Sequence, residues 1–482
     1  MNHPVTIGID VATAGVRALA VCGGTVLASA AAPLPAPVRD GRGRSEQDAR
    51  SWWPAVKTVL AKVTGELPGR GGEVAAVAVA ATSGTIVGVD ASGEPVTPAL
   101  MYDDRRGAEL NREATELGAD RWRRLGFGVS ATAALGRIAW LAERVPGVAG
   151  IRHTPDLIAG ELTGGPVASD WSHALKSGYD PLALEWPNEV FDALRVPESL
   201  LPPVVAPATV LGTVARPVAG LPAGCPVVAG MTDGCAGQLA AGAVTPGSFV
   251  GILGTTYVLK GVTENLVPDP TGAMYSHRHP DGWWLPGGAS NTGGEAVAGQ
   301  GRLPELDAAA AAAGPAKVVA YPLRRKGERF PFASADAEGF VTGKGGEVGV
   351  VELHRARLEG VAFLERLALD HLRRLGVTLS EPLLAAGGGS KSPLWTRIRA
   401  TVTGLGLRVS PQAETGYGAA LLAAAGILPG GLTEASEGLG QGTLVEPDER
   451  ESAALAESYL RFCTELHTRG WIDDELFAVV RR

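Results

Sequence analysis

The sequence predicts an α/β protein of two domains, and three observations lead to this prediction. At 482 residues, the chain is longer than a single hydrophobic core usually serves. Segments with strand character alternate with segments of helical spacing in both halves. A strand–turn–strand pattern near the N-terminus returns near residue 250. We therefore expect a first domain over residues 1–244 and a second over residues 245–482.

The first half opens on a predicted β-hairpin. The apolar run Val5–Asp10 predicts a buried strand, and Ala18–Val21 predicts its partner after a turn of small residues. A third strand is expected at Thr25–Ala28. The strand Val74–Ala81 and the helical stretches Glu46–Thr64 and Arg105–Leu117 follow.

The second half repeats this pattern. Ser248–Leu253, a Gly-Thr-Thr turn and Tyr257–Leu259 predict a second hairpin. Two similar domains explain the repeat, although hairpins rich in Gly, Thr and Val are common enough for chance to be the alternative. The segments expected afterwards are helices over Ala308–Gly314, Leu353–Leu375 and Pro393–Thr403, a strand over Leu383–Ala386, and an amphipathic helix in the tail from Glu446.

Composition excludes several classes of protein. The net charge of −8 argues against nucleic acid as the main partner, because phosphate binding needs a basic surface. With 45% hydrophobic and 20% charged residues, the chain is not disordered as a whole. Its four cysteines are too few for a disulfide framework. Without a signal peptide or a membrane-spanning apolar run, we expect a cytoplasmic protein with no membrane partner.

Two carboxylates follow apolar strands at their carboxyl ends, where α/β sheets bind ligands. Asp10 precedes a turn of small residues; it can hold Mg²⁺, while the turn amides and the Thr13 hydroxyl meet phosphate oxygens. Asp233 follows the strand Pro226–Ala229 and is placed as a general base for an attacking hydroxyl. Simpler roles also explain each residue alone, Asp10 as a hairpin cap and Asp233 as a helix N-cap.

A glycine-rich turn and a charged aromatic segment complete the candidate set. Gly387–Gly389 lies between a short strand and a helix opened by Ser392 and Pro393, and lets a flat ring or a phosphate approach the backbone. Its spacing matches neither a Walker A loop nor a dinucleotide fingerprint. Tyr102–Arg106, after the loop Thr82–Thr85, offers hydroxyl-binding groups for a polyol. An ordinary glycine turn and a solvated helix start are the alternatives.

In this order, the four motifs resemble the FGGY family of carbohydrate kinases, which share the actin-like ATPase fold. The resemblance implies two RNase H-like domains with a cleft between them, and it covers almost the whole chain. Further similar elements are Glu46-Gln47-Asp48 before Trp52-Trp53, Asp170-Trp171-Ser172-His173-Ala174 (the family's Asp-x-Ser-Asn-Ala), Gly254-Thr255-Thr256, and Glu414 with Gly418-Ala419-Ala420.

The resemblance implies a kinase that uses ATP and Mg²⁺ on a small-molecule sugar, and it gives each matching residue a role. Asp233 would be the catalytic base, and Asp10 would hold Mg²⁺ and share in catalysis. Ser83, Tyr102 and Asp104 would line the sugar side. The residues implied for ATP are Thr13, Gly254, Thr255, Thr256, Gly388, Gly389, Ser392 and Trp395. The sequence leaves the oligomeric state open, and a homodimer is compatible with it.

Several segments look closest to the D-ribulokinase branch of plants and cyanobacteria. They are Thr82–Thr85, Ser169–Tyr179, Tyr275–His277, Gly287–Gly294 and Tyr321–Phe330. Xylulose kinases tend to carry Met-His-Gly in place of Thr82-Ser83-Gly84. We therefore expect phosphorylation of D-ribulose at its terminal hydroxyl. D-Xylulose or another polyol is the alternative substrate, and an actin-like nucleotide-binding scaffold is the alternative class.

One loop departs from the family pattern, which usually runs Asp-x-Gly-Thr-Ser. Here both the glycine and the serine are alanine, at Ala12 and Ala14. Ala12 is strained if this turn needs a positive φ, and a hydroxyl is missing at Ala14. The change implies weaker ATP handling, a different substrate, or no consequence.

Overall fold

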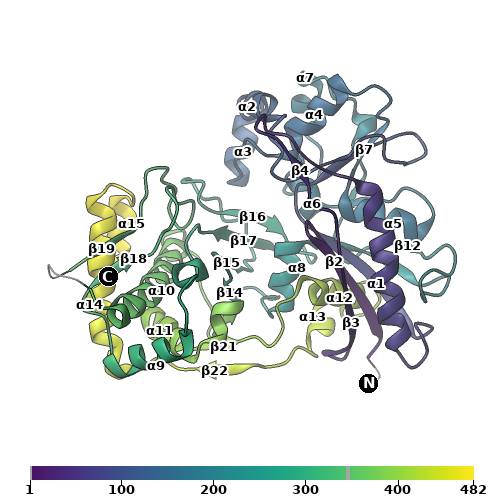
Figure 1. The fold of residues 1–482 in the computed structure, drawn as a ribbon. Coiled ribbons are helices and arrows are strands. Elements are labelled where there is room, and N and C mark those ends of the chain that lie inside the picture. Colours follow the sequence, from purple (N-terminus) through teal and green to yellow (C-terminus); the bar gives the residue numbers. More distant parts are fainter. Residues whose placement is uncertain (1–2, 344–347) are drawn as a thin grey trace. The chain divides into compact units, whose positions relative to one another are not determined.

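The computed structural model describes residues 3–343 and 348–482. Its helices and strands fall into two compact units (Figure 1). Unit 1 contains the chain up to Ala240 together with His277–Trp283 and Ala413–Leu439. Unit 2 contains Ala241–Ser276, Trp284–Gln412 and Gly440–Arg482. The expected division into residues 1–244 and 245–482 differs from these units, because two later segments pack within unit 1.

A six-stranded mixed sheet forms the centre of unit 1. In spatial order its strands are β12 (Val210–Thr213), β13 (Pro226–Thr232), β6 (Val74–Ala81), β1 (Val5–Ala12), β2 (Gly15–Cys22) and β3 (Thr25–Pro33). The predicted hairpin is confirmed as the antiparallel pair β1–β2. Strands β6 and β13 run parallel to β1, so the carboxyl ends of all three meet at one edge of the sheet.

Alternate residues of β1 point to opposite sides of the sheet, where α12 (Thr415–Ala425) packs on β1 itself and α1 (Trp52–Glu66) packs on the neighbouring strands β2 and β3. Ile7 and Ile9 belong to the apolar core that α1 completes. Thr6 and Gly8 face α12, where the Thr6 hydroxyl donates to the Ala420 carbonyl oxygen at 2.9 Å. A Cβ atom on Gly8 would overlap the Gly416 carbonyl oxygen. The small residues around Gly416 therefore let α12 lie directly on the sheet.

The rest of unit 1 surrounds this sheet. A five-stranded sheet has the order β4 (Val38–Arg39), β5 (Ser45–Gln47), β8 (Ala99–Leu100), β7 (Ile86–Val89) and β9 (Gly150–His153), and β10 (Ser169–Asp170) pairs with β11 (Val204–Val205). The helices are α2 (Ala108–Leu117), α3 (Ala119–Leu125), α4 (Ala134–Arg144), α5 (Thr154–Thr163), α6 (Trp171–Leu175), α7 (Asn188–Ala193), α8 (Asp233–Ala240) and α13 (Gly431–Ser436), with 3₁₀ turns η1 (Ala49–Ser51) and η2 (Glu198–Leu200).

One predicted helix begins later than expected. The sequence predicted a helix from Glu46, but Glu46 lies in β5 and pairs with Leu100 of β8. Asp48 then caps η1 by accepting a hydrogen bond from the Arg50 amide, and α1 starts at Trp52. A capping aspartate ahead of the apolar period is the signal that marks this start.

Unit 2 is built on a seven-stranded sheet, of which only His277 and Arg278 in the first strand are counted with unit 1. Its order is β16 (Tyr275–Arg278), β17 (Trp284–Ala289), β15 (Tyr257–Gly261), β14 (Phe249–Leu253), β20 (Leu383–Ala386), β21 (Leu407–Val409) and β22 (Thr443–Val445). The second predicted hairpin is confirmed as β14–β15, and β20 runs parallel to β14. Both sheets thus combine an antiparallel hairpin with a parallel strand on the far side of its first strand, which supports the predicted duplication.

Long helices pack against one another in unit 2 (Figure 1). The remaining elements are α9 (Leu303–Ala313), α10 (Val350–Arg374), α11 (Pro393–Thr403), α14 (Glu449–Thr468), α15 (Asp474–Val480), β18 (Val319–Tyr321), β19 (Phe340–Thr342), η3 (Gly294–Val297) and η4 (Gly388–Lys391). The predicted tail helix is α14, which buries Leu455, Tyr459 and Phe462 in the core. Across the described residues, no helix is both long and apolar enough to span a membrane.

Candidate active site

Strand register brings the two predicted carboxylates to one edge of the unit 1 sheet. Asp10 of β1 lies opposite Ala80 of β6, and Thr232 of β13 lies opposite Ala81. Asp10, the loop that follows Ala81, and Asp233 therefore emerge side by side at the carboxyl ends of neighbouring parallel strands. This is the edge at which open α/β sheets bind ligands.

Asp10 carries the most perturbed carboxyl group of this edge. It is only 9% exposed, and its Oδ1 atom has no hydrogen-bond partner. Burial, followed by the charges of Asp233 and Glu414, raises the pKa of Asp10 to about 7, against the opposing effect of Arg17. A buried carboxylate oxygen without a partner, repelled by neighbouring carboxylates, is suited to a cation.

The arrangement fits Mg²⁺ held mainly by a ligand's oxygens. Within residues 3–343 and 348–482, no group of three or more His, Cys, Asp or Glu side chains is arranged to hold a metal ion. Mg²⁺ usually takes one or two protein carboxylates, with water and substrate phosphates completing its shell. One carboxylate at Asp10 is therefore a sufficient protein contribution.

Asp233 begins α8 and is partly exposed. Its Oδ1 atom accepts a hydrogen bond from the Gly234 amide at 2.7 Å, and its backbone carbonyl accepts one from the Thr415 hydroxyl at 3.4 Å. The side chain is thus fixed at the sheet edge while remaining accessible to a small molecule. A general base needs this combination.

The altered turn between β1 and β2 is unstrained. Among the residues that the structure describes, six that are not glycine have positive φ angles, and neither Ala12 nor Ala14 is one of them. The strain considered for Ala12 does not arise. Neighbours hold the turn from outside, because Gln47 Nε2 donates to the Thr13 carbonyl at 3.0 Å and the Leu34 amide donates to the Ala14 carbonyl at 3.0 Å.

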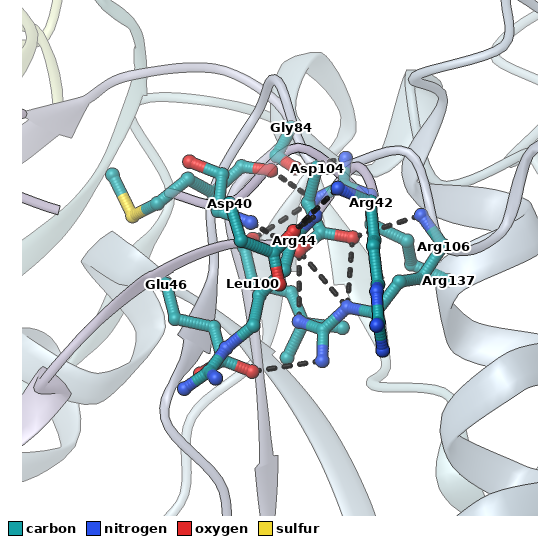
Figure 2. A network of polar contacts seen from close by, with 11 residues as sticks. Asp40, Arg42, Arg44, Glu46, Gly84, Leu100, Asp104, Arg106 and Arg137 are labelled. Atoms are coloured by element: carbon teal, nitrogen blue, oxygen red, sulfur yellow. Dashed lines mark hydrogen bonds and ion pairs between the residues drawn. The ribbon is translucent and has the colours of Figure 1, made fainter. Parts of the chain in front are cut away.

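The three residues predicted for the sugar side differ in accessibility. Ser83 follows β6, and its buried Oγ atom has no hydrogen-bond partner. Tyr102 is 44% exposed. Asp104 is fully buried, and its carboxylate accepts hydrogen bonds from the Ser45 amide and from the Arg106 guanidinium (Figure 2). Asp104 therefore braces the segment around Tyr102 instead of lining a surface, which differs from its predicted role.

Arg137, which the sequence analysis did not single out, joins two loops of the predicted sugar side. Its guanidinium donates to the carbonyl oxygens of Gly84 at 2.7 Å, Leu100 at 2.8 Å and Met101 at 2.6 Å (Figure 2). Complete burial lowers its pKa to about 10, so it stays charged at neutral pH. An arginine on the apolar face of α4 was the available sequence signal.

In unit 2, the hairpin tip Gly254–Thr256 is exposed at Thr255 and supported from behind. The Gly294 amide donates to the Gly254 carbonyl at 2.9 Å, and the Glu295 amide donates to the Thr255 carbonyl at 3.0 Å. A Cβ atom on Gly294 would overlap the Gly254 carbonyl oxygen, so only glycine allows this approach. The segment Gly287–Gly294 therefore shapes the predicted phosphate loop.

Glu328 is a second residue that sequence reasoning missed. Its Oε2 atom accepts hydrogen bonds from the hydroxyls of Ser290 at 2.8 Å, Thr292 at 3.1 Å and Tyr321 at 2.9 Å, and its Oε1 atom accepts the Asn291 amide at 2.6 Å. It thereby joins the segments Gly287–Gly294 and Tyr321–Phe330 beneath the hairpin tip. No sequence signal pointed to this role, because only the folded chain shows that Glu328 is buried.

The glycine-rich turn of the predicted adenosine site has one open position. A Cβ atom on Gly388 would meet nothing within 4 Å, whereas one on Gly389 would overlap the Leu253 side chain. Gly387 has φ +89°, and a Cβ atom there would lie 2.6 Å from the Leu253 carbonyl oxygen. Gly388 therefore leaves space for a ligand, while Gly387 and Gly389 allow the turn to pack on β14.

Ser392 and Trp395 support this turn from the protein side. The Ser392 hydroxyl caps α11 by accepting from the Trp395 amide at 3.1 Å, and it donates to Asp307 at 2.7 Å. Trp395 is 4% exposed, and its indole N–H donates to the Leu358 carbonyl at 3.0 Å. Trp395 therefore lies in the core and offers no face to adenine, contrary to the direct contact expected from sequence.

A buried ion pair connects the two segments of unit 2 that carry the loops predicted to bind the nucleotide. Arg399 on α11 and Glu365 on α10 are fully buried and joined by two contacts of 2.6 and 2.8 Å. Arg399 also donates to the Gly251 carbonyl of β14 at 3.1 Å and to the Ser390 hydroxyl at 3.2 Å. The pair fixes the glycine-rich turn relative to the strand that carries the hairpin tip.

Comparison with known proteins decides the family. The model of the N-terminal domain of the FGGY family of carbohydrate kinases matches residues 5–240, and the model of its C-terminal domain matches residues 247–427. The chain belongs to the FGGY family of carbohydrate kinases. The resemblance read from the motifs is thereby confirmed, and this FGGY kinase is an ATP-dependent carbohydrate kinase.

Relatives of this FGGY kinase extend over nearly its full length. It is 32% identical to a xylulose kinase of Streptomyces rubiginosus over 435 residues, 89% of each chain. It is 31% identical to a xylulose kinase of Streptomyces coelicolor over 441 residues, again 89% of each. None of these similarities singles out the D-ribulokinase branch.

Solved structures confirm the predicted fold class of the FGGY kinase. The crystal structure of xylulose kinase from Rhodospirillum rubrum superposes with a TM-score of 0.86 at 26% identity, covering 99% of this chain and all of that one. Plasmodium falciparum glycerol kinase with ADP superposes with a TM-score of 0.84 at 17% identity, covering 98% of this chain and 99% of that one, which shows the shared fold alone.

Proposed function

We propose that this FGGY kinase transfers the γ-phosphoryl group of ATP to the terminal hydroxyl of a pentulose, and that D-ribulose is its substrate. The observation that carries the proposal is the Ser83 hydroxyl, buried without a partner at the same sheet edge as Asp10 and Asp233. Buried hydroxyls are nearly always hydrogen-bonded, so a sugar hydroxyl would complete this one. The small Thr82-Ser83-Gly84 loop is the feature shared with the D-ribulokinase branch.

The residues of unit 1 would carry the chemistry. Asp233 would accept the proton of the sugar hydroxyl as its oxygen bonds to the γ-phosphorus, while the bond to the β–γ bridging oxygen breaks and ADP leaves. Asp10 would hold Mg²⁺, which neutralises phosphate charge when bound. The turn amides and the Thr13 hydroxyl would orient the phosphate oxygens beside it.

The residues of unit 2 would bind ATP. The exposed backbone and hydroxyls of Gly254–Thr256 would contact phosphate oxygens. The open backbone at Gly388, with Gly389 next to it, would receive the adenosine. Phosphoryl transfer depends mainly on positioning and charge stabilisation, which these loops are braced to supply.

D-Xylulose is the second candidate substrate. The two Streptomyces relatives, which match 89% of the chain at 31–32% identity, are xylulose kinases. D-Ribulose and D-xylulose differ only in the configuration at one carbon, so the loop after β6 has to discriminate between them by the direction of a single hydroxyl.

A sugar panel tests the proposal. ADP formation would be measured in a coupled assay with D-ribulose, D-xylulose, ribitol and no sugar, for the wild type and Asp233→Asn as the control for contaminating kinases. We expect the highest kcat/KM with D-ribulose. A tenfold higher kcat/KM with D-xylulose would show that D-xylulose is the substrate. ADP formation that none of the sugars increases would overturn the kinase proposal.

A further inference from the structure

A buried polar cluster outside the predicted site connects two of its strands. Asp170 ends β10, and Ser172 and His173 belong to the first turn of α6. All three side chains are buried, His173 completely. They lie in the segment where the family pattern has Asp-x-Ser-Asn-Ala, and His173 occupies the position of the asparagine. None of them has a role in the proposed function.

Ser172 holds the strand that leads into Asp233. Its Oγ atom accepts a hydrogen bond from the Thr232 amide at 3.0 Å and donates to Asp170 Oδ1 at 2.5 Å. Thr232 is the last residue of β13, and its peptide directly precedes Asp233. The Asp170–Ser172 pair therefore fixes the backbone from which Asp233 projects.

His173 holds the strand that leads into the loop of Ser83. Its Nδ1 atom lies 2.5 Å from Asp170 Oδ2, and its Nε2 atom lies 3.2 Å from the Ala81 carbonyl oxygen. Ala81 is the last residue of β6 and the register partner of Thr232. The cluster therefore binds the last residues of both strands, Ala81 of β6 and Thr232 of β13. Ala81 directly precedes the loop of Ser83, and Thr232 directly precedes Asp233.

We propose that His173 is a positioning residue for phosphoryl transfer, because with Asp170 and Ser172 it fixes the end of β6 relative to the end of β13. The distance between a sugar bound at the loop after β6 and the carboxylate of Asp233 would depend on this cluster. The inference rests on the proposed function for the roles of Ser83 and Asp233.

The contacts of His173 require a charged ring. Both nitrogens face acceptors, a carboxylate and a carbonyl, and only an imidazolium donates to both. Burial alone would lower the pKa of His173, but the charge and hydrogen bond of Asp170, with smaller contributions from Asp156 and the Ala81 carbonyl, raise it. The ring of His153, in β9, also lies nearby, with its centroid 6.0 Å from that of His173.

The test separates the two contacts of His173. In His173→Gln the amide nitrogen can take the place of Nε2 and donate to Ala81, whereas in His173→Leu both contacts are lost. We expect His173→Leu to lower kcat on the order of 10- to 100-fold with little change in KM for ATP, the scale of a misplaced reacting group. His173→Gln should recover most of this loss.

The pH profile distinguishes positioning from a purely structural role. Wild-type kcat should fall at a pH above 6.5, the ordinary histidine pKa, as His173 loses its proton, and this decline should be absent in His173→Gln. His153→Gln is the matched control. His153 is equally buried, but its ring contacts Asp156, Ser169 and Ser177, none of which lies in β6 or β13. Its replacement should lower thermal stability and leave the pH profile unchanged.

Two measurements do not depend on knowing the sugar. Nitrogen NMR of the wild type should show both His173 ring nitrogens protonated at pH 6.5, where half of the ordinary histidine side chains are neutral, and Ser172→Ala should speed hydrogen exchange at the Thr232 amide. A neutral His173 ring, or His173→Leu with wild-type kcat and pH profile, would overturn the inference. A wild type that phosphorylates no pentulose, but passes both measurements, would count against the proposed function and leave the bracing of the two strand ends intact.

Discussion

At the level of one residue, the buried carboxyl group of Asp10 lowers the stability of the folded protein at neutral pH. Its folded-state pKa of about 7 exceeds the ordinary 3.8, so the native protein binds an extra proton between these values. Stability therefore falls as pH rises from 4 to 7 and stays reduced above 7. We expect Asp10→Asn to stabilise the ligand-free protein at pH 7.5 by on the order of a few kcal/mol, and far less at pH 4.5. Urea unfolding at both pH values measures the difference.

Asp40 is the control for this prediction, because its pKa is shifted in the opposite direction from that of Asp10. It is exposed, and the amides of Arg42 and Arg44 lower its pKa. Asp40→Asn should therefore give no stabilisation that grows with pH. An Asp10→Asn variant with the same stability increment at pH 4.5 and 7.5 would show that the Asp10 carboxyl titrates normally.

Asp233 is the residue on which the chemical step is predicted to depend. Asp233→Asn keeps the shape of the side chain and an oxygen for the Gly234 amide, so the fold should be maintained. Losing a general base typically costs 10²–10⁴-fold, and we expect kcat to fall by about 10²-fold or more with KM for ATP nearly unchanged. Steady-state kinetics measure both quantities. Retention of a tenth of wild-type turnover would remove Asp233 from this role.

Individual side chains also mark the limit of prediction from sequence. The carboxylates Asp10 and Asp233 were predictable because both follow apolar strands, and strand order then places them at one edge. The buried positions of Asp104 and Trp395 were not, because a motif gives the residue type but not the direction of the side chain. Arg137 and Glu328 were missed for the same reason: each acts on backbone or hydroxyl groups that only the folded chain brings together.

At the level of elements, the glycine-rich turn before α11 combines two different requirements for glycine. Gly388→Val would extend into open space, so we expect it to raise KM for ATP several-fold or more without a large change in Tm. Gly389→Val would overlap Leu253 of β14 and should lower Tm by several degrees, since overpacking costs about 1–3 kcal/mol. KM for each substrate and thermal denaturation of both variants measure these effects.

The two substitutions control for each other. If Gly388→Val changed KM for the sugar as much as KM for ATP, or changed neither, the turn would be structural and adenosine would bind elsewhere. The sequence alone predicted the same role for Gly388 and Gly389, because the two glycines differ only in the atoms that a Cβ at each would meet in the folded chain.

Most elements of the fold were predictable from apolar periodicity, and the exceptions have local causes. Both hairpins, β6, β20, α10 and α11 lie within a few residues of their predicted positions. The predicted start of α1 at Glu46 was wrong because Glu46 lies in β5, which pairs with β8, a strand far away in the sequence. Pairing of this kind overrides local helical spacing.

At the level of the whole molecule, the repeated hairpin correctly indicated two similar sheets, but the chain does not divide into two consecutive halves. The segment Ala413–Leu439 belongs to unit 1 although residues on both sides of it belong to unit 2. Its helix α12 is rich in Gly and Ala, a composition that gives no amphipathic period pointing to a partner. The close approach of Gly8 on the sheet to Gly416 on the helix, which appears only in the folded chain, shows that α12 packs directly on β1.

Because unit 1 includes the later segment Ala413–Leu439, we predict that a fragment ending at residue 240 does not fold by itself. The cut matches the end of the N-terminal family model, yet it removes α12 from the face of β1, β6 and β13. Ala80 and Val228 would lose their packing against Ala419 and Ala423, and the Thr6 hydroxyl would lose its acceptor. We expect residues 1–240 to aggregate or to lack near-ultraviolet circular dichroism, and co-expression with residues 241–482 to restore a soluble complex. A cooperative unfolding transition of the isolated fragment, with native-like circular dichroism, would show that α12 is dispensable for unit 1.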